Sequence, residues 1–334
     1  MDRQGLKAVI TQPRVSVIIT SYNAGEYLGE AIESVLAQSR PADEIVVIDD
    51  GSTDATPDVA RRYASRGVRL VQQTNMGAGA ARNRGIQETT GELVAFLDGD
   101  DLWLPHKLER QLEYLADHPE TVMVSCLRWR WDQTTGERHI EYFGVRPGRS
   151  LALENVVRNV IGNPSMTLIR RSVFDAVGRF DPTLRWGQDW DLFIRITRYG
   201  PVGFVMEPLM IYRWHPGGIS HHRGIERLDM FQLIACRGIS RVHPVWLRPI
   251  LLARRLSWDQ CDRAAYAAQI GLPGWRRVWH ACLGLVLFPF ERPVSKTKRL
   301  LRSIFGDDRY AHVGGMLRST LRQPVSNHER LQSP

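Results

Sequence analysis

The sequence has few cysteines and no long apolar segment. Its four cysteines, Cys126, Cys236, Cys261 and Cys282, form no Cys-x-x-Cys motif. This spacing argues against a zinc or redox site of that type and against a disulfide framework, so we expect a reducing compartment. The longest apolar run, Ala281 to Phe290, is shorter than the roughly 20 residues that span a bilayer, and the first fourteen residues lack the pattern of a secretory signal. We therefore expect a cytoplasmic protein, with the inner face of the cell membrane as an alternative location.

The charge of the chain is unevenly distributed along its length. The whole sequence has 44 Lys and Arg against 36 Asp and Glu, a formal charge of +8. Residues 1–222 contain 25 basic and 28 acidic side chains, whereas residues 223–334 contain 19 and 8. The excess of positive charge is therefore confined to the C-terminal third of the chain. Because this region contains no recognisable nucleic-acid-binding module, we expect no nucleic acid partner.

The hydrophobic pattern predicts an α/β fold. Short β-branched or apolar strands are expected at 15–19, 45–48, 68–71 and 93–97, and helices at 28–36, 57–65, 77–87 and 106–117. Strands in which apolar and polar residues do not alternate, separated by helices, indicate a mostly parallel central sheet that is covered on both faces. Further strands are expected at 122–127, 165–170 and 202–206, and helices at 151–161, 172–177 and 190–199. We expect one domain over residues 13–220 and a helical, basic C-terminal region over 221–334.

An acidic loop follows the fourth expected strand. It reads Asp98-Gly99-Asp100-Asp101 and places three carboxylates within four residues. Like charges this close repel unless a cation or protons lie among them, and carboxylate oxygens suit Mg²⁺ or Mn²⁺, which commonly share them with substrate phosphates. The alternative is a solvated acidic turn that caps the helix beginning near Pro105. The residues alone leave both interpretations open.

Two further loops carry polar residues at the ends of expected strands. The first, from Asp49 to Asp54, offers carboxylates that could accept hydrogen bonds from a base or a ribose, although Asp54 could simply cap the next helix. The second contains Gly77-x-Gly79, but Arg82 stands where a dinucleotide fingerprint has its third glycine, and the first loop also lacks that fingerprint. A dinucleotide-dependent oxidoreductase is therefore disfavoured, and a glycine-rich entry followed by an arginine suits a diphosphate.

Together these loops resemble the family 2 glycosyltransferases. The resemblance extends over about residues 13–220 through the segments VSVIITSYNAGEYLGEAIESVLAQ, EIVVIDDGSTDAT, NMGAGAARNRGI, GELVAFLDGDD, WGQDWDLFIRI and YRWHPGGIS. It implies a GT-A fold and inverting, metal-dependent transfer from a nucleoside diphosphate sugar, with a UDP-sugar favoured and Mn²⁺ or Mg²⁺ as cofactor. Because the Gln-x-x-Arg-Trp motif and transmembrane helices of the processive members are absent, transfer of a single sugar is favoured.

The same resemblance implies roles for individual residues. Thr20, Tyr22 and Asp50 would hold the nucleotide base, Arg82 would lie near the nucleotide, and Asp98 and Asp100 match the ends of the family's Asp-x-Asp motif. Asp100, with Asp101 and His215, would meet the metal and diphosphate, and the sequence leaves open which of the two aspartates ligates the metal. In the segment where the family often has Glu-Asp, this chain has Gln188-Asp189, so Asp189 is favoured as the general base over Asp191, which we expect to start a helix.

Some expectations stay open between two interpretations. Trp103, Trp186 and Trp190 could line a sugar site or pack in the core. The basic, tryptophan-rich C-terminal region suits a membrane surface, a solvated appendage or a homo-oligomer contact. The acceptor would be a sugar or a lipid-linked saccharide in the synthesis of a cell-surface polysaccharide or glycolipid. The alternative function is a catalytically silent nucleotide-sugar-binding scaffold at a membrane assembly complex.

Overall fold

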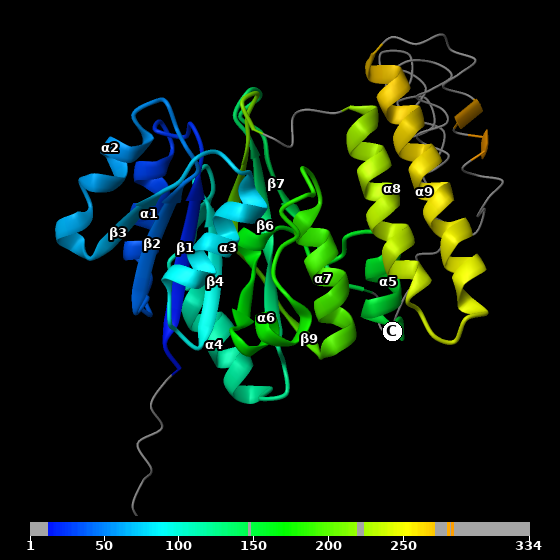
Figure 1. The fold of residues 1–334 in the computed structure, drawn as a ribbon, viewed down its shortest axis with the longest axis horizontal. Coiled ribbons are helices and arrows are strands. Elements are labelled where there is room, and N and C mark those ends of the chain that lie inside the picture. Colours follow the sequence, from blue (N-terminus) through cyan, green and yellow to red (C-terminus); the bar gives the residue numbers. More distant parts are fainter. Residues whose placement is uncertain (1–12, 146–147, 219–223, 271–278, 281, 284–334) are drawn as a thin grey trace, which may run out of the picture. The chain divides into compact units, whose positions relative to one another are not determined.

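A computed structural model describes residues 13–145, 148–218, 224–270, 279–280 and 282–283 (Figure 1). The chain forms two compact units, one of residues up to 223 together with 229–251 and the other of residues 224–228 with those from 252 onward. Residues 229–251 thus belong to the first unit, and the domain boundary expected at 220 and 221 stays a prediction.

The first four long strands form a parallel sheet. They are β1 (Val15–Ser21), β2 (Glu44–Asp49), β3 (Val68–Gln72) and β4 (Leu93–Asp98), in the spatial order β3-β2-β1-β4 (Figure 1). All three neighbouring pairs are parallel. Every residue of β1 is buried, as the run of Val and Ile predicts for a strand covered on both faces.

Helices cover the two faces of this sheet and enclose two hydrophobic clusters. They are α1 (Leu28–Leu36), α2 (Thr56–Arg61), α3 (Ala78–Glu88), α4 (Lys107–Asp117), α5 (Leu151–Val157), α6 (Ser172–Val177) and α7 (Gln188–Tyr199). One cluster joins α1 and α4 to the odd-numbered positions of β1, and the other joins α3 and α7 to Ile18. The α3 helix lies so close to β1 that a Cβ atom on Gly85 would come within 2.2 Å of Cγ2 of Ile18.

The second half of the sheet is mixed. Its strands are β5 (Leu102–Trp103), β6 (Met123–Asp132), β7 (Arg138–Glu141), β8 (Leu168–Arg170) and β9 (Val202–Trp214). β8 pairs antiparallel with both β4 and β6, β7 pairs antiparallel with β6, and β5 pairs antiparallel with β9. Among the described strands of this half, only β6 and β9 pair in parallel, so the expectation of a mostly parallel sheet holds for the first four strands and not for the rest.

Two strands differ in length from the sequence-based expectation. The expected strand at 165–170 is shortened to Leu168–Arg170, because Pro164–Met166 forms a 3-10 turn. β9 runs well beyond 206, and its pairing with β6 is interrupted between Cys126 and Arg128, where β9 contains extra residues around Met206. After this bulge, β9 continues beside β6 as far as Trp214.

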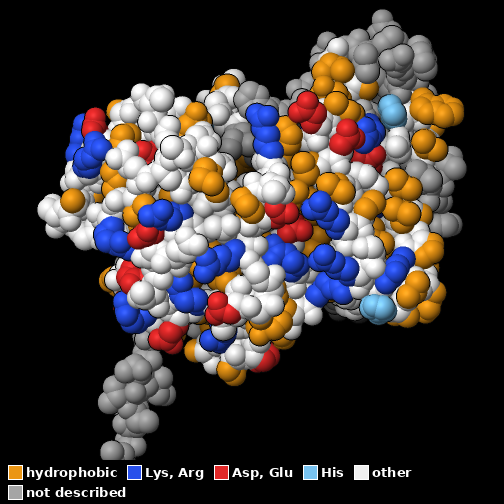
Figure 2. Space-filling model, in the orientation of Figure 1, with side chains coloured by type: hydrophobic (Ala, Val, Ile, Leu, Met, Phe, Trp, Pro, Cys, Tyr) orange, Lys and Arg blue, Asp and Glu red, His pale blue; other side chains and the backbone are white. Residues whose placement is uncertain are grey.

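The region after residue 222 contains two described helices, α8 (Ile225–Ser240) and α9 (Leu247–Gln269). Within the described residues, no helix is both long and apolar enough to cross a membrane. In the basic C-terminal region, Arg254 and Arg255 are buried, whereas Lys296, Lys298 and Arg299 lie outside the described residues. In Figure 2, basic and acidic side chains lie next to one another over much of the face drawn, as the ion pairs of the first unit require.

Candidate functional site

The polar loops after β1, β2 and β4 meet at one edge of the sheet. Thr20 pairs with Asp98 across β1 and β4, and the Thr20 hydroxyl donates to Oδ1 of Asp98 at 3.3 Å. The backbone N–H of Asp50 donates to the carbonyl of Ser21 at 2.9 Å. Parallel strands end at a common edge of a sheet, and this edge is where open α/β sheets bind ligands. Segments 78 residues apart in sequence are thereby brought into contact.

A carboxylate and an imidazole meet beside the acidic loop. Nε2 of His215 lies 3.1 Å from Oδ2 of Asp100, and the His215 ring packs against Tyr27 with 4.8 Å between ring centroids. The Asp100 side chain is 30% exposed and that of His215 is 11% exposed. The His215 ring is therefore packed against the protein, whereas the Asp100 carboxylate remains accessible to a ligand.

Asp101 has very different surroundings from its neighbour Asp100. It is fully buried, and its carboxylate accepts hydrogen bonds from Oγ of Ser165 at 2.7 Å, Nδ2 of Asn163 at 3.2 Å and the backbone N–H of Arg213 at 3.3 Å. Burial, reinforced by the charges of Asp100 and Asp98, raises the pKa of Asp101 well above its ordinary value. Its oxygens tie the acidic loop to β9, and its predicted place beside the metal stays a prediction.

Three charged groups gather on the other side of the acidic loop. Nη2 of Arg82 donates to Oδ1 of Asp98 at 2.6 Å, and the guanidinium lies 5.5 Å from the ring centroid of Phe180. Asp189 lies close enough to Arg82 and Asp98 for both charges to shift its pKa. Burial raises the pKa of Asp189, the positive charge of Arg82 lowers it, and the negative charge of Asp98 raises it again. The structure thus brings Arg82, Asp98 and Asp189 together.

The two aspartates at the start of α7 have distinct partners. The helix begins after Gly187, whose φ of +73° is the left-handed conformation that glycine adopts most readily. The Asp191 carboxylate accepts from Nε and Nη2 of Arg195, one turn along the helix, at 3.1 and 2.8 Å. Asp191 is therefore engaged in an ion pair of its own helix, which favours Asp189 as the group available for chemistry.

Asp50 and Tyr22 lie at the nucleotide end of the predicted site. The Asp50 carboxylate accepts from Nε2 of Gln73 at 2.7 Å and from the backbone N–H groups of Met76 and Gly77 at 2.9 and 2.8 Å. These bonds fix the glycine-rich loop before α3. Tyr22 is 50% exposed and leaves its ring available for stacking.

Comparisons with known proteins identify the chain's relatives. The sequence model of Glycosyl transferase family 2 matches residues 16–178. The chain is 31% identical over 242 residues to a putative teichuronic acid biosynthesis glycosyltransferase of Bacillus subtilis, covering 93% of that protein and 67% of this chain. The chain belongs to glycosyltransferase family 2.

Other curated relatives of this family 2 chain are longer than the matched region. An uncharacterized glycosyltransferase of Nostoc is 48% identical over 223 residues, which are 63% of this chain and 66% of that protein. An uncharacterized glycosyltransferase of Rickettsia felis is 35% identical over 209 residues, which are 61% of this chain but 34% of that protein. The match thus spans about a third of the Rickettsia felis relative.

Two groups of solved structures share the GT-A fold of this family 2 chain. The Staphylococcus aureus TarS fragment 1–349 in complex with UDP has a TM-score of 0.59, with 18% identity and 92% of each chain covered. The mannosyltransferase PcManGT from Pyrobaculum calidifontis, in complex with GDP-Man and Mn²⁺, has a TM-score of 0.55, with 21% identity, and 92% of this chain and 88% of that one are covered. At these identities the likeness concerns the fold.

The residues of the acidic loop fit a metal that is shared with a substrate. Within the described residues, no three His, Cys, Asp or Glu side chains form a complete metal site. Asp100 and His215 offer one oxygen and one nitrogen ligand on adjacent atoms. Mg²⁺ and Mn²⁺ are typically bound through one or two protein groups and completed by substrate phosphates. The donor set therefore suits a metal that arrives with a diphosphate.

One residue of the site, Ser165, was not found by sequence reasoning. Oγ of Ser165 accepts the backbone N–H of Asp98 at 3.1 Å and donates to Asp101, so this hydroxyl links both ends of the acidic loop. Its only sequence signal is a polar interruption, Asn163-Pro164-Ser165, in an apolar stretch.

Trp103 and Trp190, which were candidates for a sugar site, are both buried. Their indole N–H groups donate to backbone carbonyls, so both rings pack in the core.

Proposed function

We propose that this chain is a metal-dependent, inverting glycosyltransferase. It moves a single sugar from a nucleoside diphosphate sugar, with a UDP-sugar favoured, to an acceptor hydroxyl. The observation that carries this proposal is the position of Asp189 beside the Arg82 and Asp98 pair. A base next to a group that can bind phosphate is the arrangement that direct displacement at an anomeric carbon requires.

Asp189 acts as the general base in this reaction. Its carboxylate takes the proton of the acceptor hydroxyl while the oxygen forms a bond to the anomeric carbon, and the bond from that carbon to the diphosphate oxygen breaks on the opposite side. The configuration of the sugar is therefore inverted. A positioned base contributes about 10²–10⁴-fold to such a step. Burial of Asp189 supports the role, because a raised pKa makes the carboxylate a stronger base.

Arg82, Asp100 and His215 surround the leaving group. Nε of Arg82 is buried and has no hydrogen-bond partner among the described residues, so it is free to donate to a phosphate oxygen. Asp100 and His215 would hold Mn²⁺ or Mg²⁺, which supplies Lewis-acid neutralisation of the charge on the departing diphosphate. We assign Asp101 a positioning role, because its oxygens already accept three hydrogen bonds.

The nucleotide lies at the ends of β1 and β2 in this proposal. Tyr22 would stack on the base, and Thr20 and Asp50 would line its pocket. The acceptor would be a saccharide of a cell-surface polymer or glycolipid, which the name of the Bacillus subtilis relative supports.

The test compares two aspartates of the same helix turn. UDP release is measured with a panel of UDP-sugars and Mn²⁺ for the wild type, Asp189→Asn and the control Asp191→Asn. We expect Asp189→Asn to lose at least about a hundredfold in turnover while it binds UDP normally, since only the base is removed. Asp191→Asn should keep turnover within a few fold.

Two outcomes would contradict the proposal. Turnover by Asp189→Asn at the wild-type rate would remove this residue as the base. UDP binding without turnover of any donor by the wild type would favour the nucleotide-sugar-binding scaffold instead.

A further inference from the structure

One buried charge has no role in the proposed reaction. Lys107, the first residue of α4, is fully buried, and burial lowers its pKa to about 8. Among the residues that the structure describes, no carboxylate forms an ion pair with it. Its ammonium donates to Oε1 of Gln111 at 2.8 Å and lies 4.1 Å from the ring centroid of Trp103. An ammonium without a counter-charge is costly to bury, so these two contacts are what hold it inside.

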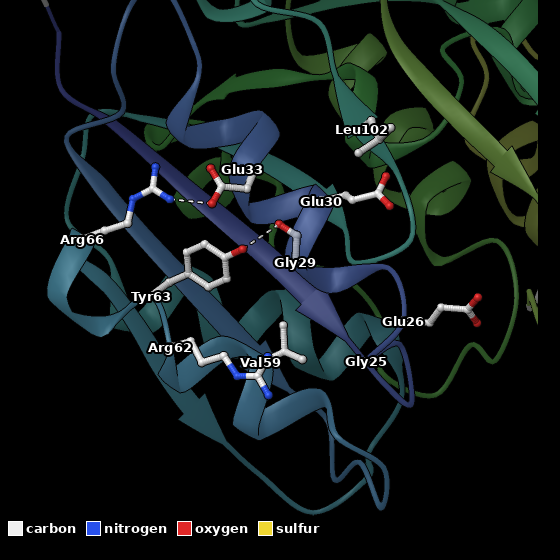
Figure 3. A pocket seen from close by; sticks show the side chains of 10 residues that line it. All are labelled: Gly25, Glu26, Gly29, Glu30, Glu33, Val59, Arg62, Tyr63, Arg66 and Leu102. Carbon is white, nitrogen blue, oxygen red and sulfur yellow. Dashed lines mark hydrogen bonds and ion pairs between the residues drawn. The ribbon is translucent and has the colours of Figure 1, made fainter.

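The surface cavity between α1 and α2 shows a more usual arrangement of charges. It has a volume of about 700 Å³ and is lined by both basic and acidic residues (Figure 3). Glu33 pairs with Arg66, as the dashed line in Figure 3 marks, and Glu30 pairs with Arg213 of β9. Opposite charges meet in these pairs, whereas the described contacts of Lys107 are an amide and a ring.

The Lys107 ammonium determines which way the Gln111 amide points. An ammonium can only donate hydrogen bonds, so Gln111 must turn its oxygen toward Lys107 and its NH₂ group away. The NH₂ group then donates to the backbone carbonyls of Met166 at 2.8 Å and Val124 at 3.3 Å. Gln111 is itself fully buried, which makes an unpaired donor or acceptor costly. The amide therefore ties α4 to β6 and to the 3-10 turn Pro164–Met166.

The Trp103 side chain forms a second link to the same 3-10 turn. Its indole N–H donates to the backbone carbonyl of Ser165 at 2.9 Å. The carbonyls of Ser165 and Met166 are thus each held by a side chain that Lys107 contacts. Because two adjacent carbonyls are fixed, the backbone of the turn has little freedom, and the direction of the Ser165 side chain is fixed with it.

The Ser165 hydroxyl is the group through which the turn meets the acidic loop. It accepts the backbone N–H of Asp98 at 3.1 Å and donates to Oδ2 of Asp101 at 2.7 Å. Asp100, the proposed metal ligand, lies between these two residues in the chain. A shift of the hydroxyl would therefore release both ends of the loop that carries Asp100.

We propose that Lys107 is a positioning residue for the metal side of the site. It holds the Gln111 amide and the Trp103 ring, these hold the 3-10 turn, and the turn holds the acidic loop in the shape that presents Asp100 to a metal. The assignment rests on the proposed glycosyltransferase function. Lys107 acts on Asp100 only through the Ser165 hydroxyl.

The test measures how much Mn²⁺ each variant of the full chain needs for half-maximal UDP binding. UDP is titrated by calorimetry over a series of Mn²⁺ concentrations into the wild type, Lys107→Met, Ser165→Ala and the double variant of these two. Lys107→Met keeps an unbranched side chain and removes its donors and charge. Urea unfolding gives the free energy of unfolding of every variant.

Two control variants separate positioning from stability and from surface charge. Leu115→Ala removes apolar volume from the same helix and the same core cluster, and a leucine side chain makes none of the hydrogen bonds described above. Arg66→Met removes an exposed basic side chain that lines the cavity in Figure 3. Leu115→Ala should lose unfolding free energy and keep the Mn²⁺ dependence of the wild type, and Arg66→Met should change neither measurably.

The expected shifts follow the order of the contacts. Lys107→Met should need about threefold to tenfold more Mn²⁺ than the wild type, because losing an outer support of a metal ligand weakens metal binding. Ser165→Ala removes the support that touches the loop and should need about tenfold more or beyond. The double variant should match Ser165→Ala, because Lys107 acts through this hydroxyl and coupled changes do not add.

A milder variant serves if Lys107→Met does not fold. Trp103→Phe keeps a ring beside the ammonium and removes the N–H that holds the Ser165 carbonyl, so it should raise the Mn²⁺ requirement by about twofold to fivefold. It should likewise add nothing to Ser165→Ala.

Three results would overturn the proposal. The first is an unchanged Mn²⁺ dependence in Lys107→Met, or in Trp103→Phe where Lys107→Met does not fold. The second is a double variant whose shift equals the product of the two single shifts. The third is a shift in Leu115→Ala as large as that in Lys107→Met. Failure of the wild type to bind UDP would instead refute the proposed function.

Discussion

Nε2 of His215 lies 3.1 Å from Oδ2 of Asp100, although 115 positions separate the two residues in the sequence. The contact exists because β9 continues past its bulge and ends beside the loop that follows β4. The partly exposed carboxylate and the largely buried imidazole form one wall of the site proposed to bind the metal and diphosphate.

The first prediction concerns metal affinity. His215→Ala removes one of the two proposed metal ligands, so we expect about tenfold or more Mn²⁺ to be needed for half-maximal UDP binding. The measurement is UDP binding by calorimetry over a series of Mn²⁺ concentrations. His118→Ala, at the exposed end of α4, serves as the control and should match the wild type. Unchanged Mn²⁺ dependence in His215→Ala would exclude the imidazole as a ligand.

The second prediction concerns the pH dependence of turnover. Because burial raises the pKa of Asp189, the base becomes protonated and activity falls as the pH drops through a value above the ordinary 3.8. Arg82 opposes this shift, so Arg82→Gln should move the acidic limb of the kcat profile to higher pH. Arg82→Lys keeps the charge and should leave the limb closer to that of the wild type.

The pH profiles are recorded at saturating donor, so that weaker binding by the Arg82 variants does not enter kcat. A limb that stays at the same pH in Arg82→Gln would show that this charge does not act on the base.

The third prediction compares two glycines that both lie inside helices. An alanine Cβ at position 85 would collide with Ile18, so Gly85→Ala should lower the free energy of unfolding by about 1–3 kcal/mol. At Gly29 the nearest atoms are 3.5 Å or more away, and Gly29→Ala should be neutral or stabilise by up to about 1 kcal/mol. Urea unfolding measures both, and equal effects would contradict the close approach of α3 to β1.

The fourth prediction concerns stability in acid. Burial raises the pKa of Glu44, but hydrogen bonds from Ser16, Thr90 and Gly91 outweigh it and lower the pKa to about 2. Since the folded-state pKa lies below the ordinary value of 4.5, this carboxylate stabilises the fold above pH 4.5 and loses that contribution as the pH falls toward about 2. Glu44→Gln should therefore show a smaller loss of unfolding free energy between pH 6 and pH 3 than the wild type.

The solvent-exposed Glu113→Gln is the control for the acid experiment, because its partner Arg110 is also exposed. Urea unfolding at each pH gives the free energies. If Glu44→Gln and the wild type lose stability in parallel, the hydrogen bonds to Glu44 do not contribute to acid sensitivity.

Much of the first half of the fold was predictable from residue patterns. The runs at 15–19 and 93–97 are apolar on both sides of the strand, which only a sheet covered on both faces accommodates. Their common direction then brings the loops with Thr20 and Asp98 to one edge. The meeting of these two residues therefore followed from local sequence and the rules of parallel sheets.

The rest depended on tertiary contacts that a local pattern does not encode. Strand β7 has four residues with no apolar alternation, and it forms because the turn after Asp132 returns the chain to β6. Ser165 carries no motif, and its role arises from the approach of the 3-10 turn to the acidic loop. The distinction between Asp100 and Asp101 is likewise a matter of burial, and adjacent aspartates look alike in a sequence.

The bulge in β9 divides that strand into a part that tolerates changes of length and a part that does not. Around Met206, where the pairing with β6 is already irregular, an added residue would enlarge the existing bulge. Between Met210 and Trp214 the pairing is continuous, and one added residue there would exchange the two sides of the strand. Trp214 would then take the place of His215 beside Asp100, and the guanidinium that meets Glu30 would be turned away. Insertions and deletions among related chains should therefore accumulate before Met210 and be rare after it.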